Sequence, residues 1–457
     1  MRTKHTEEQN NTLLVVVLTS YMSTFNASAL NLSIPNIGEE FTASAQLVGW
    51  IVTLFTLLNV ALSLPFGKLS DITDKVKIFR AGVLIFSAGI FVCAFSQGIW
   101  MMLASRAVQG VGAAMIFATN MAILIDAFSP QERGRVLGIS VSFTYVGLST
   151  GPVLGGIINN YFGWRYIMLL AGLMSLVVIY IMYRKLKPAS AVKADFRAFD
   201  SKGSVLYTLA MVLVLYGMAI VGTGIKCWAV IAAGLVLTLL FVRCELRAED
   251  PMLKVVIFKN KGFTYSALAA FMNYAATMSV SYFMSIYLQV VKGYPSQFAG
   301  LVLVTAPLIQ AIFSPVAGRL SDRHSPYKLS SAGMGACAVS LLLLCTMNEN
   351  TPIYMIIPML AVMGVGFALF STPNTNAMMS AVAAEDRGIA SSIVATMRNA
   401  GGSTAMAILT VVVGMKMGSL GMYEAPIDLI VQTMHLSFMI FSGVCFVGIF
   451  LSLKRGK

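Results

Sequence analysis

The stretch Gly67-Lys-Leu-Ser-Asp71 recurs, with one conservative change, as Gly318-Arg-Leu-Ser-Asp322. The dipeptide Arg133-Gly134 recurs as Arg387-Gly388 at nearly the same offset, 254 residues against 251. Two near-equal offsets indicate that the chain contains two copies of one structural unit. Internal repeats of this kind are typical of secondary transporters.

The composition excludes several classes of protein. Of the 457 residues, 57% are hydrophobic and 11% are charged, against about 25% charged in soluble domains. Too few polar residues are present to coat a soluble core, so a soluble enzyme, a disordered chain and a fibrous protein are excluded. The six cysteines have no metal or redox spacing. The composition indicates an all-α integral membrane protein. The sequence contains no nucleophile motif, phosphate loop or cofactor motif, so we do not expect an enzyme.

Fourteen long stretches are nearly free of charge, and each is long enough to cross a bilayer as a helix. They are 12–34, 45–66, 79–97, 99–125, 136–160, 164–183, 203–225, 227–243, 263–290, 296–317, 329–348, 351–372, 388–415 and 431–453. With both termini in the cytoplasm, 26 of the 32 Lys and Arg residues fall on the cytoplasmic side and four on the outside. This bias predicts fourteen spans and that orientation. The net charge of +13 is then explained by the enrichment of Lys and Arg in the cytoplasmic loops. We therefore expect no nucleic-acid partner.

The repeat predicts the domain organisation. Residues 1–186 form a first six-helix bundle and residues 263–457 a second. Residues 187–262 hold charged linkers and two additional transmembrane helices inserted between the bundles.

The repeated Gly67–Asp71 segment follows span two and is expected to be a loop. Gly67 would allow a tight turn, and Asp71 would meet a helix N-terminus or an arginine across the bundle. The segment is either a polar turn or part of a gate. The second copy, with Gly318 and Asp322, favours the gate.

Span four contains Arg106, Gln109 and Gly110. An arginine inside a span costs about 2.5–3.5 kcal/mol on insertion scales, which favours a functional role. Gln109 and Gly110 lie on the same helix face as Arg106. The alternative is an arginine near the helix end whose side chain extends to the membrane surface.

Span five carries glycines at intervals of four, which form one bare ridge with a proline beside it. Such a ridge suits a hinge or a close helix crossing, and Pro152 removes a backbone hydrogen bond. Simple small-residue packing is the alternative. The residues are Gly147, Gly151, Pro152, Gly155 and Gly156.

Span nine places Tyr274, Met278 and Tyr282 on one face. Such a stripe faces lipid or the core, or it lines a substrate path, where adaptable Met and aromatic surfaces suit lipophilic ligands.

These motifs resemble those of the major facilitator superfamily. The segment from Gly67 resembles its signature loop, although Asp74 and Val76 depart from the pattern. The segment around Arg106 is similar to its span-four motif, in which the arginine is linked to proton transfer. The ridge resembles its antiporter motif, which marks exporters. Further segments resemble the fourteen-span drug:proton antiporters: Asn31–Pro35, Pro251–Leu253 with Phe258–Asn260, Pro373–Asn376 and Arg398–Gly402.

The family often has an acid in span one, where this chain has Asn26. We expect Asn26 to face the central cavity. No acid placed deep in another span of the sequence replaces the missing one. A cationic substrate and the identity of the proton carrier are therefore open. Arg398, inside span thirteen, is added to the candidate substrate or proton pathway.

The resemblance implies a monomeric bacterial inner-membrane exporter of small amphipathic or lipophilic compounds, such as drugs, driven by protons and needing no cofactor. A dedicated exporter of one metabolite or antibiotic has the same fold and is the first alternative. A non-transporting receptor is the second, although the longest cytoplasmic stretch, about 19 residues, is too short for a soluble domain.

Overall fold

The computed structural model describes residues 6–31, 33–43, 45–187, 199–221, 226–248, 250–253, 255–417 and 426–454. Regular secondary structure within these ranges is entirely helical. This is the expected outcome for apolar spans, because a helix satisfies its backbone hydrogen bonds internally where water is absent.

The first half of the chain forms one bundle in which α1 packs against α6 and α7, and α5 packs against α3 and α4. Its helices are α1 (Glu7–Asn31), α2 (Ile34–Glu40), α3 (Ala45–Ile72), α4 (Lys75–Ala94), α5 (Ile99–Ala127), α6 (Arg133–Tyr161) and α7 (Trp164–Lys185).

The second half forms a corresponding bundle in which α14 packs against α12 and α13, and α10 packs against α15 and α16. It consists of η2 (Val255–Lys259), α10 (Lys261–Ile286), the π-helical η3 (Tyr287–Val291), α11 (Ser296–Leu303), α12 (Thr305–Arg323), α13 (Pro326–Leu344), α14 (Ile353–Ser380), η4 (Ala384–Asp386), α15 (Arg387–Met417) and α16 (Ile427–Leu453).

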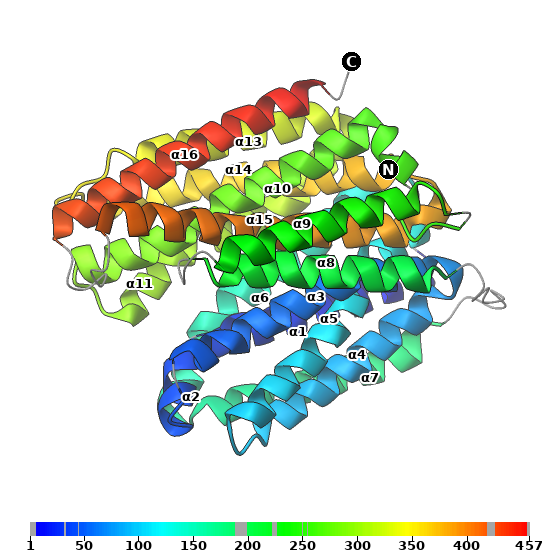
Figure 1. Cartoon of the computed structure of the whole chain (residues 1–457), viewed down its shortest axis with the longest axis horizontal. Helices are drawn as coiled ribbons and strands as arrows, with labels where there is room; N and C mark the ends of the chain where they lie inside the picture. Colours follow the sequence, from blue (N-terminus) through cyan, green and yellow to red (C-terminus); the bar gives the residue numbers. More distant parts are fainter. Residues whose placement is uncertain are drawn as a thin grey trace.

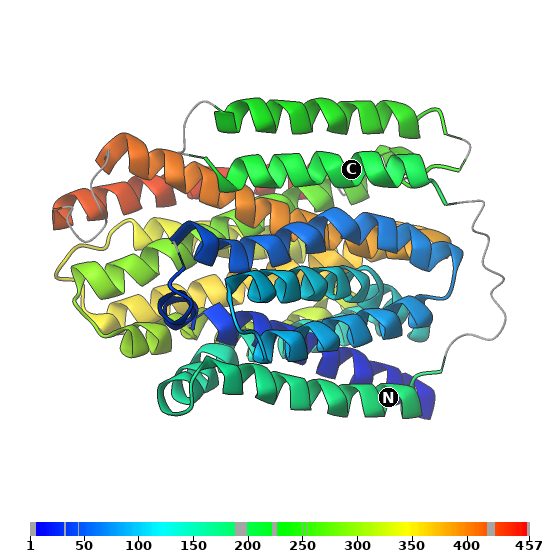
Figure 2. The ribbon, with the colours of Figure 1, turned by 60° about the horizontal axis from the view of Figure 1, so that its bottom comes forward.

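Between the bundles the chain forms a hairpin of α8 (Ser201–Ala219) and α9 (Lys226–Glu245). It lies along the outside of the molecule, shown in green in Figure 2. Helix α8 contacts both α3 and α15, and the Tyr207 hydroxyl lies 3.4 Å from Thr396 Oγ1. The inserted hairpin therefore touches both bundles. The division into 1–186, 187–262 and 263–457 stays a prediction.

Thirteen candidate membrane spans, long and apolar enough to cross a bilayer, occur among the described residues. The expected span 263–290 corresponds to α10, which has 26 residues but carries Asn273 and several hydroxyl side chains within its apolar sequence. The count of fourteen therefore rests on the sequence argument.

Both termini lie at the same end of the helices (Figure 1). We call this end the terminal face. The hydrogen bonds that join the bundles lie toward it: Ser392 donates to the Ser63 carbonyl, and Ser142 donates to the Ala311 carbonyl. At these two contacts α3 packs against α15, and α6 packs against α12.

The Gly67–Asp71 segment is not a loop. It forms the last turns of α3, and Gly318–Asp322 forms the last turns of α12. The expected tight turn at Gly67 is therefore wrong. The polar residues lie in the last turns of these two helices, where backbone N–H groups of the opposite bundle satisfy the carboxylates of Asp71 and Asp322.

Candidate functional site

Two carboxylates join the bundles at the terminal face. Asp71 of α3 accepts hydrogen bonds of 2.9 Å from the backbone N–H groups of Gly388 and Ile389. Asp322 of α12 accepts bonds of 2.7 and 2.9 Å from those of Gly134 and Arg135. Each acid thus binds the N-terminus of a helix in the opposite bundle, where unpaired N–H groups and the helix dipole favour negative charge.

Glycines make these contacts possible. A Cβ added to Gly67 would lie 2.9 Å from the Gly388 carbonyl oxygen, and one added to Gly388 would lie 2.7 Å from the Gly67 oxygen. A Cβ on Gly134 would lie 2.5 Å from the Gly318 oxygen. The two sequence repeats are therefore partners in space, since each Gly–Asp segment contacts the Arg–Gly dipeptide of the other half.

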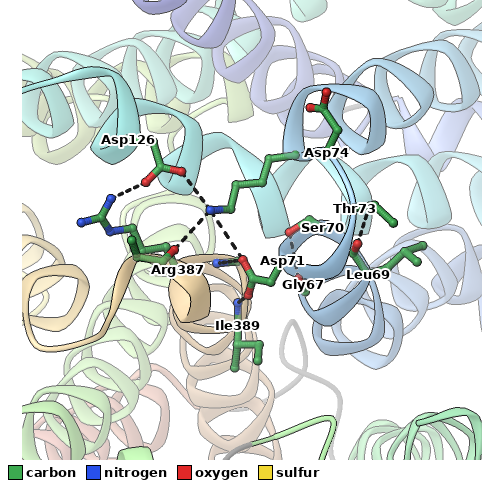
Figure 3. A network of polar contacts seen from close by, with 12 residues as sticks. Gly67, Leu69, Ser70, Asp71, Thr73, Asp74, Asp126, Arg387 and Ile389 are labelled. Carbon is green, nitrogen blue, oxygen red and sulfur yellow. Dashed lines mark hydrogen bonds and ion pairs between the residues drawn. The ribbon is translucent and has the colours of Figure 1, made fainter. Parts of the chain in front are cut away.

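A charged network extends the contact made by Asp71, as Figure 3 shows. Lys75 Nζ lies 2.8 Å from Asp126 Oδ2 and 3.7 Å from Asp71 Oδ1, and Arg387 pairs with Asp126. Asp126 of the first bundle is thereby joined to α15 of the second. Asp126 also lies within electrostatic reach of Arg133, at the start of α6.

The glycine ridge of α6 packs on α1. An added Cβ would lie 2.7 Å from the Tyr21 carbonyl oxygen at Gly147, 2.7 Å from Ser28 Cβ at Gly151 and 3.0 Å from Ala29 Cα at Gly155. Pro152 and Gly156 lie within the same uninterrupted helix. The ridge is a close helix crossing inside the first bundle.

Arg106 is buried inside the first bundle, with 1% of its surface exposed. Its Nε donates to the Ile51 carbonyl at 2.9 Å, its Nη1 donates to Gln109 Oε1 at 2.7 Å, and its guanidinium lies 4.4 Å from the centre of the Phe55 ring. Arg106 forms no ion pair with any acid in the described part of the chain. Arg106 is therefore a cation inside the bundle. Its side chain does not extend to the membrane surface, which was the alternative interpretation of the sequence.

Asn26 joins the same network. Its Nδ2 donates to Gln109 Oε1 at 3.0 Å, and Gln109 Nε2 donates to the Gly89 carbonyl. Asn26 is fully buried, which differs from the expected position on an open cavity face. The reason is packing: α1 turns this residue toward α5, where Gln109 supplies its partner. Gly110, next in α5, allows close approach of α3 at Phe55.

A second interior cation lies between the bundles. Arg398 of α15 is partly buried, and its guanidinium lies 4.8 Å from the centre of the Phe117 ring on α5. The Tyr145 hydroxyl of α6 lies within electrostatic reach of Arg398, Tyr274 and Gln310. Phe367 of α14 meets both tyrosine rings edge to face. We call these residues the mid-depth cluster.

The cluster lies near the middle of the membrane. Each member is 10 to 13 residues from the terminal-face end of its helix, or about 15–20 Å at 1.5 Å per residue. A bilayer core is about 30 Å thick. Both bundles contribute, and the side chains combine one positive charge, phenol hydroxyls, an amide and aromatic faces.

Of the expected stripe on α10, Tyr274 belongs to the mid-depth cluster and its hydroxyl lies 3.5 Å from Ser371 Oγ. Met278 is 42% exposed, and Tyr282 packs against Phe283. Thr277, Ser281 and Ser285 lie beside the stripe and are at least partly exposed, which suits an aqueous path more than lipid.

Sequence reasoning missed Phe117, Tyr145, Gln310 and Phe367. These residues come from four helices, and each looks like an ordinary span residue by itself. Only the packing of the helices brings them into one cluster with Arg398. The described ranges contain no group of three or more His, Cys, Asp or Glu side chains that could hold a metal ion.

The comparisons with known proteins agree on a family. A family model described as Major Facilitator Superfamily matches residues 14–406 and 266–456. The chain is 29% identical over 440 residues to riboflavin transporter RibZ of Clostridioides difficile, covering 96% of each chain.

Two other relatives are named for multidrug resistance or efflux. The multidrug resistance protein Stp of Mycobacterium tuberculosis is 27% identical, covering 87% of this chain and 74% of the relative. The multidrug efflux pump LfrA of Mycolicibacterium smegmatis is 26% identical, covering 83% and 76%. Among solved structures, the human organic anion transporter MFSD10 shares the fold with a TM-score of 0.70 at 12% identity, covering 97% of this chain and 99% of that one.

Proposed function

The chain belongs to the Major Facilitator Superfamily and is a membrane transporter, not an enzyme, and on this premise we propose that it exports small lipophilic drugs or toxic compounds by proton antiport. The observation that carries the proposal is the reciprocal contact of Asp71 and Asp322 with helix N-termini of the opposite bundle. This contact closes one face and can be broken as a unit, which is what alternating access requires.

The proposed setting follows from charge and relatives. The terminal face carries most of the Lys and Arg residues, so we place it in the cytoplasm, with the protein as a monomer in the plasma membrane of a bacterium. This structure then represents the state closed to the cytoplasm. We propose that the chain belongs to the fourteen-span drug:proton antiporter branch, whose motifs its segments resemble.

Proton coupling is assigned to the Arg106 network. A buried cation without an acidic partner is costly unless its environment changes during the cycle. Gln109 Oε1 accepts hydrogen bonds from both Arg106 and Asn26. A movement of either side chain therefore alters the hydrogen bonding of the other. The substrate path is assigned to the mid-depth cluster with Tyr274, Met278 and Tyr282.

A dedicated exporter of one metabolite is the second candidate. The relative named as a riboflavin transporter matches 96% of the chain, a fuller match than that of either drug-resistance relative described above. Substrate breadth separates the two proposals: a drug exporter protects against several unrelated compounds, and a dedicated exporter against none or one.

The test is efflux from bacterial cells that lack their main pumps and express this chain. We expect loaded drugs and dyes to leave faster than from empty-vector cells, and a proton uncoupler to abolish the difference. Gly318→Leu, which would force α12 from α6, is the inactive control. Gly443→Leu, where an added Cβ meets nothing within 4 Å, is the active control. Efflux that survives the uncoupler would contradict proton antiport.

A further inference from the structure

The distribution of charge inside the membrane is one-sided. Every acid in the described ranges lies in a connection or within about one turn of a helix end. The interior charges are Arg106 and Arg398. Buried charges are normally paired, because an isolated one loses its hydration without compensation. Among the residues that the structure describes, the interior therefore holds two guanidinium groups and no carboxylate.

Arg398 is the interior cation that is only partly buried and has unused donors. It forms no hydrogen bond or ion pair with another residue in the described part of the chain, and its guanidinium rests against Phe117. An arginine carries five N–H donors and no acceptor. Arg106, in contrast, is fully enclosed and already donates to Ile51 and Gln109.

A neighbouring group adds an independent sign of an unfilled site. Gln310 is 5% exposed, and its Nε2 donor makes no well-formed hydrogen bond among the described residues, although its side chain lies within hydrogen-bonding reach of the Tyr145 hydroxyl. A buried donor without a well-formed hydrogen bond destabilises the site that holds it. Gln310 and Arg398 both approach the Tyr145 hydroxyl, so their free donors converge on one region.

The aromatic rings define the rest of that region. Tyr145 and Tyr274 flank Phe367 with ring centres 5.8 and 5.1 Å from it, and Phe117 covers one side of Arg398. Flat apolar faces surround a set of hydrogen-bond donors with one positive charge. Such a surface favours an aromatic molecule that carries acceptor oxygens and a negative charge.

Building on the proposed export function, we propose that the mid-depth cluster selects anionic aromatic compounds, whose carboxylate, sulfonate or phenolate group binds Arg398 and Gln310 while the ring packs against Tyr145, Tyr274 and Phe367. A cationic drug would meet Arg398 as a like charge and would find no acid among the described interior residues. The proposal narrows the substrate class within the exporter function.

The test uses two dyes with the same xanthene core. Fluorescein is an anion at neutral pH, and a rhodamine ester is a permanent cation. Efflux of each is measured in pump-deficient cells expressing equal amounts of protein. We expect wild type to export fluorescein in preference to the rhodamine ester. Arg398→Gln should lower the anion-to-cation ratio at least about tenfold, and Arg398→Lys should restore part of it.

A charge-reversal variant gives a sharper result. In Gln310→Glu a new carboxylate lies with Arg398 beside Tyr145 and offsets the positive charge there, so anion export should fall while cation export is retained or rises. Arg184→Gln is the matched control, because Arg184 also lies on an aromatic ring, that of Tyr180 at 5.6 Å, but at the end of α7. It should leave the ratio unchanged.

The outcomes separate the two proposals. If wild type exports drugs but prefers the cation, or if Arg398→Gln leaves the ratio unchanged, selection of anions is wrong and export stands. If no compound is exported by energised cells, the export proposal fails. Fluorescein polarisation with purified protein then tests the selection of anionic aromatic compounds. Binding to wild type that Arg398→Gln weakens about tenfold supports this selection, and equal binding to both proteins overturns it.

Discussion

The Asp71 carboxylate accepts a 2.9 Å hydrogen bond from the backbone N–H of Gly388, 317 residues away in the sequence. The contact joins α3 of one bundle to the start of α15 in the other. Its counterpart, between Asp322 and Gly134, joins the bundles through α12 and α6. Both contacts must break for the terminal face to open.

Asp71→Ala should favour opening of the terminal face. Hydrogen bonds to a charged group contribute about 1.5–3 kcal/mol, so loss of the carboxylate should shift the equilibrium by roughly 30-fold toward the open form. Spin labels on cysteines placed at Thr73 and Ala383, in a variant without the native cysteines, would report a longer distance. Asp428→Ala, an exposed acid at the start of α16, is the control and should leave the distance unchanged. A short distance in both variants would show that the carboxylate does not hold the face closed.

Gly151→Leu should abolish transport. An added Cβ lies 2.7 Å from Ser28 Cβ, so the larger side chain forces α6 from α1, at a cost of about 1–3 kcal/mol for overpacking. Efflux and thermal unfolding measured together should both change, with membrane insertion retained. Gly443→Leu, on open surface, should change neither. Normal efflux from Gly151→Leu would mean that the crossing adapts freely.

Arg106→Met should separate stability from function. Replacing a buried unpaired charge by an apolar side chain of similar length is often neutral or stabilising, so thermal unfolding should stay the same or shift upward. Proton-driven efflux should be lost, because the charge that interacts with Gln109 is gone. A variant that unfolds at lower temperature and keeps its uncoupler-sensitive efflux per folded molecule would assign Arg106 a structural role.

Asn26→Asp should not change the ratio of cation to neutral-compound export. The sequence favoured a cavity position for Asn26, from which a new carboxylate would attract cations. The side chain is instead buried against Gln109, so a new acid would act on the Arg106 network. Paired efflux of a permanent cation and a neutral drug tests this, and a clear gain for the cation would restore the cavity position.

Acid should release α2 from α7 at the face opposite the termini. Partial burial raises the pKa of the Glu40 carboxyl, but hydrogen bonds from Trp164 and Arg165 and the Arg165 charge lower it, and the net pKa is below the ordinary value of 4.5. A lowered pKa stabilises the contact above the unfolded-state pKa, and this contribution is lost as pH falls through the folded-state pKa. A variant with Trp164 as its sole tryptophan should show a fluorescence step below about pH 4.5, and adding Glu40→Gln should remove the step.

Labelling tests the orientation. A cysteine at Thr42, in the connection after α2, should react with a membrane-impermeant reagent on intact cells, and a cysteine at Lys187 only after permeabilisation. The excess of Lys and Arg on the terminal face is the physical reason, since such residues are retained in the cytoplasm. The reverse pattern would place that face outside.

The sequence alone determined the membrane class, the two-fold repeat and the family, and the structure and comparisons confirm an all-helical transporter of that family. Apolar length and motif spacing are local properties, so they can be read along the chain. The sequence also identified Asp71, Asp322, Arg106 and Arg398 as unusual, because polar residues next to or inside apolar spans carry an energetic cost.

What the tertiary structure decided is which residues become partners. Gly67 was expected in a turn, and it lies in a helix. Because Gly67 has no Cβ, the backbone of Gly388 can approach it closely. Asn26 was expected to face a cavity, and it binds Gln109 because α1 packs on α5 at that point. The approach of Arg398 and Gln310 to Tyr145 leaves no signal in spacing, because the three residues lie on separate helices. Pairwise contacts between distant segments depend on helix rotation and depth, and a single sequence fixes neither.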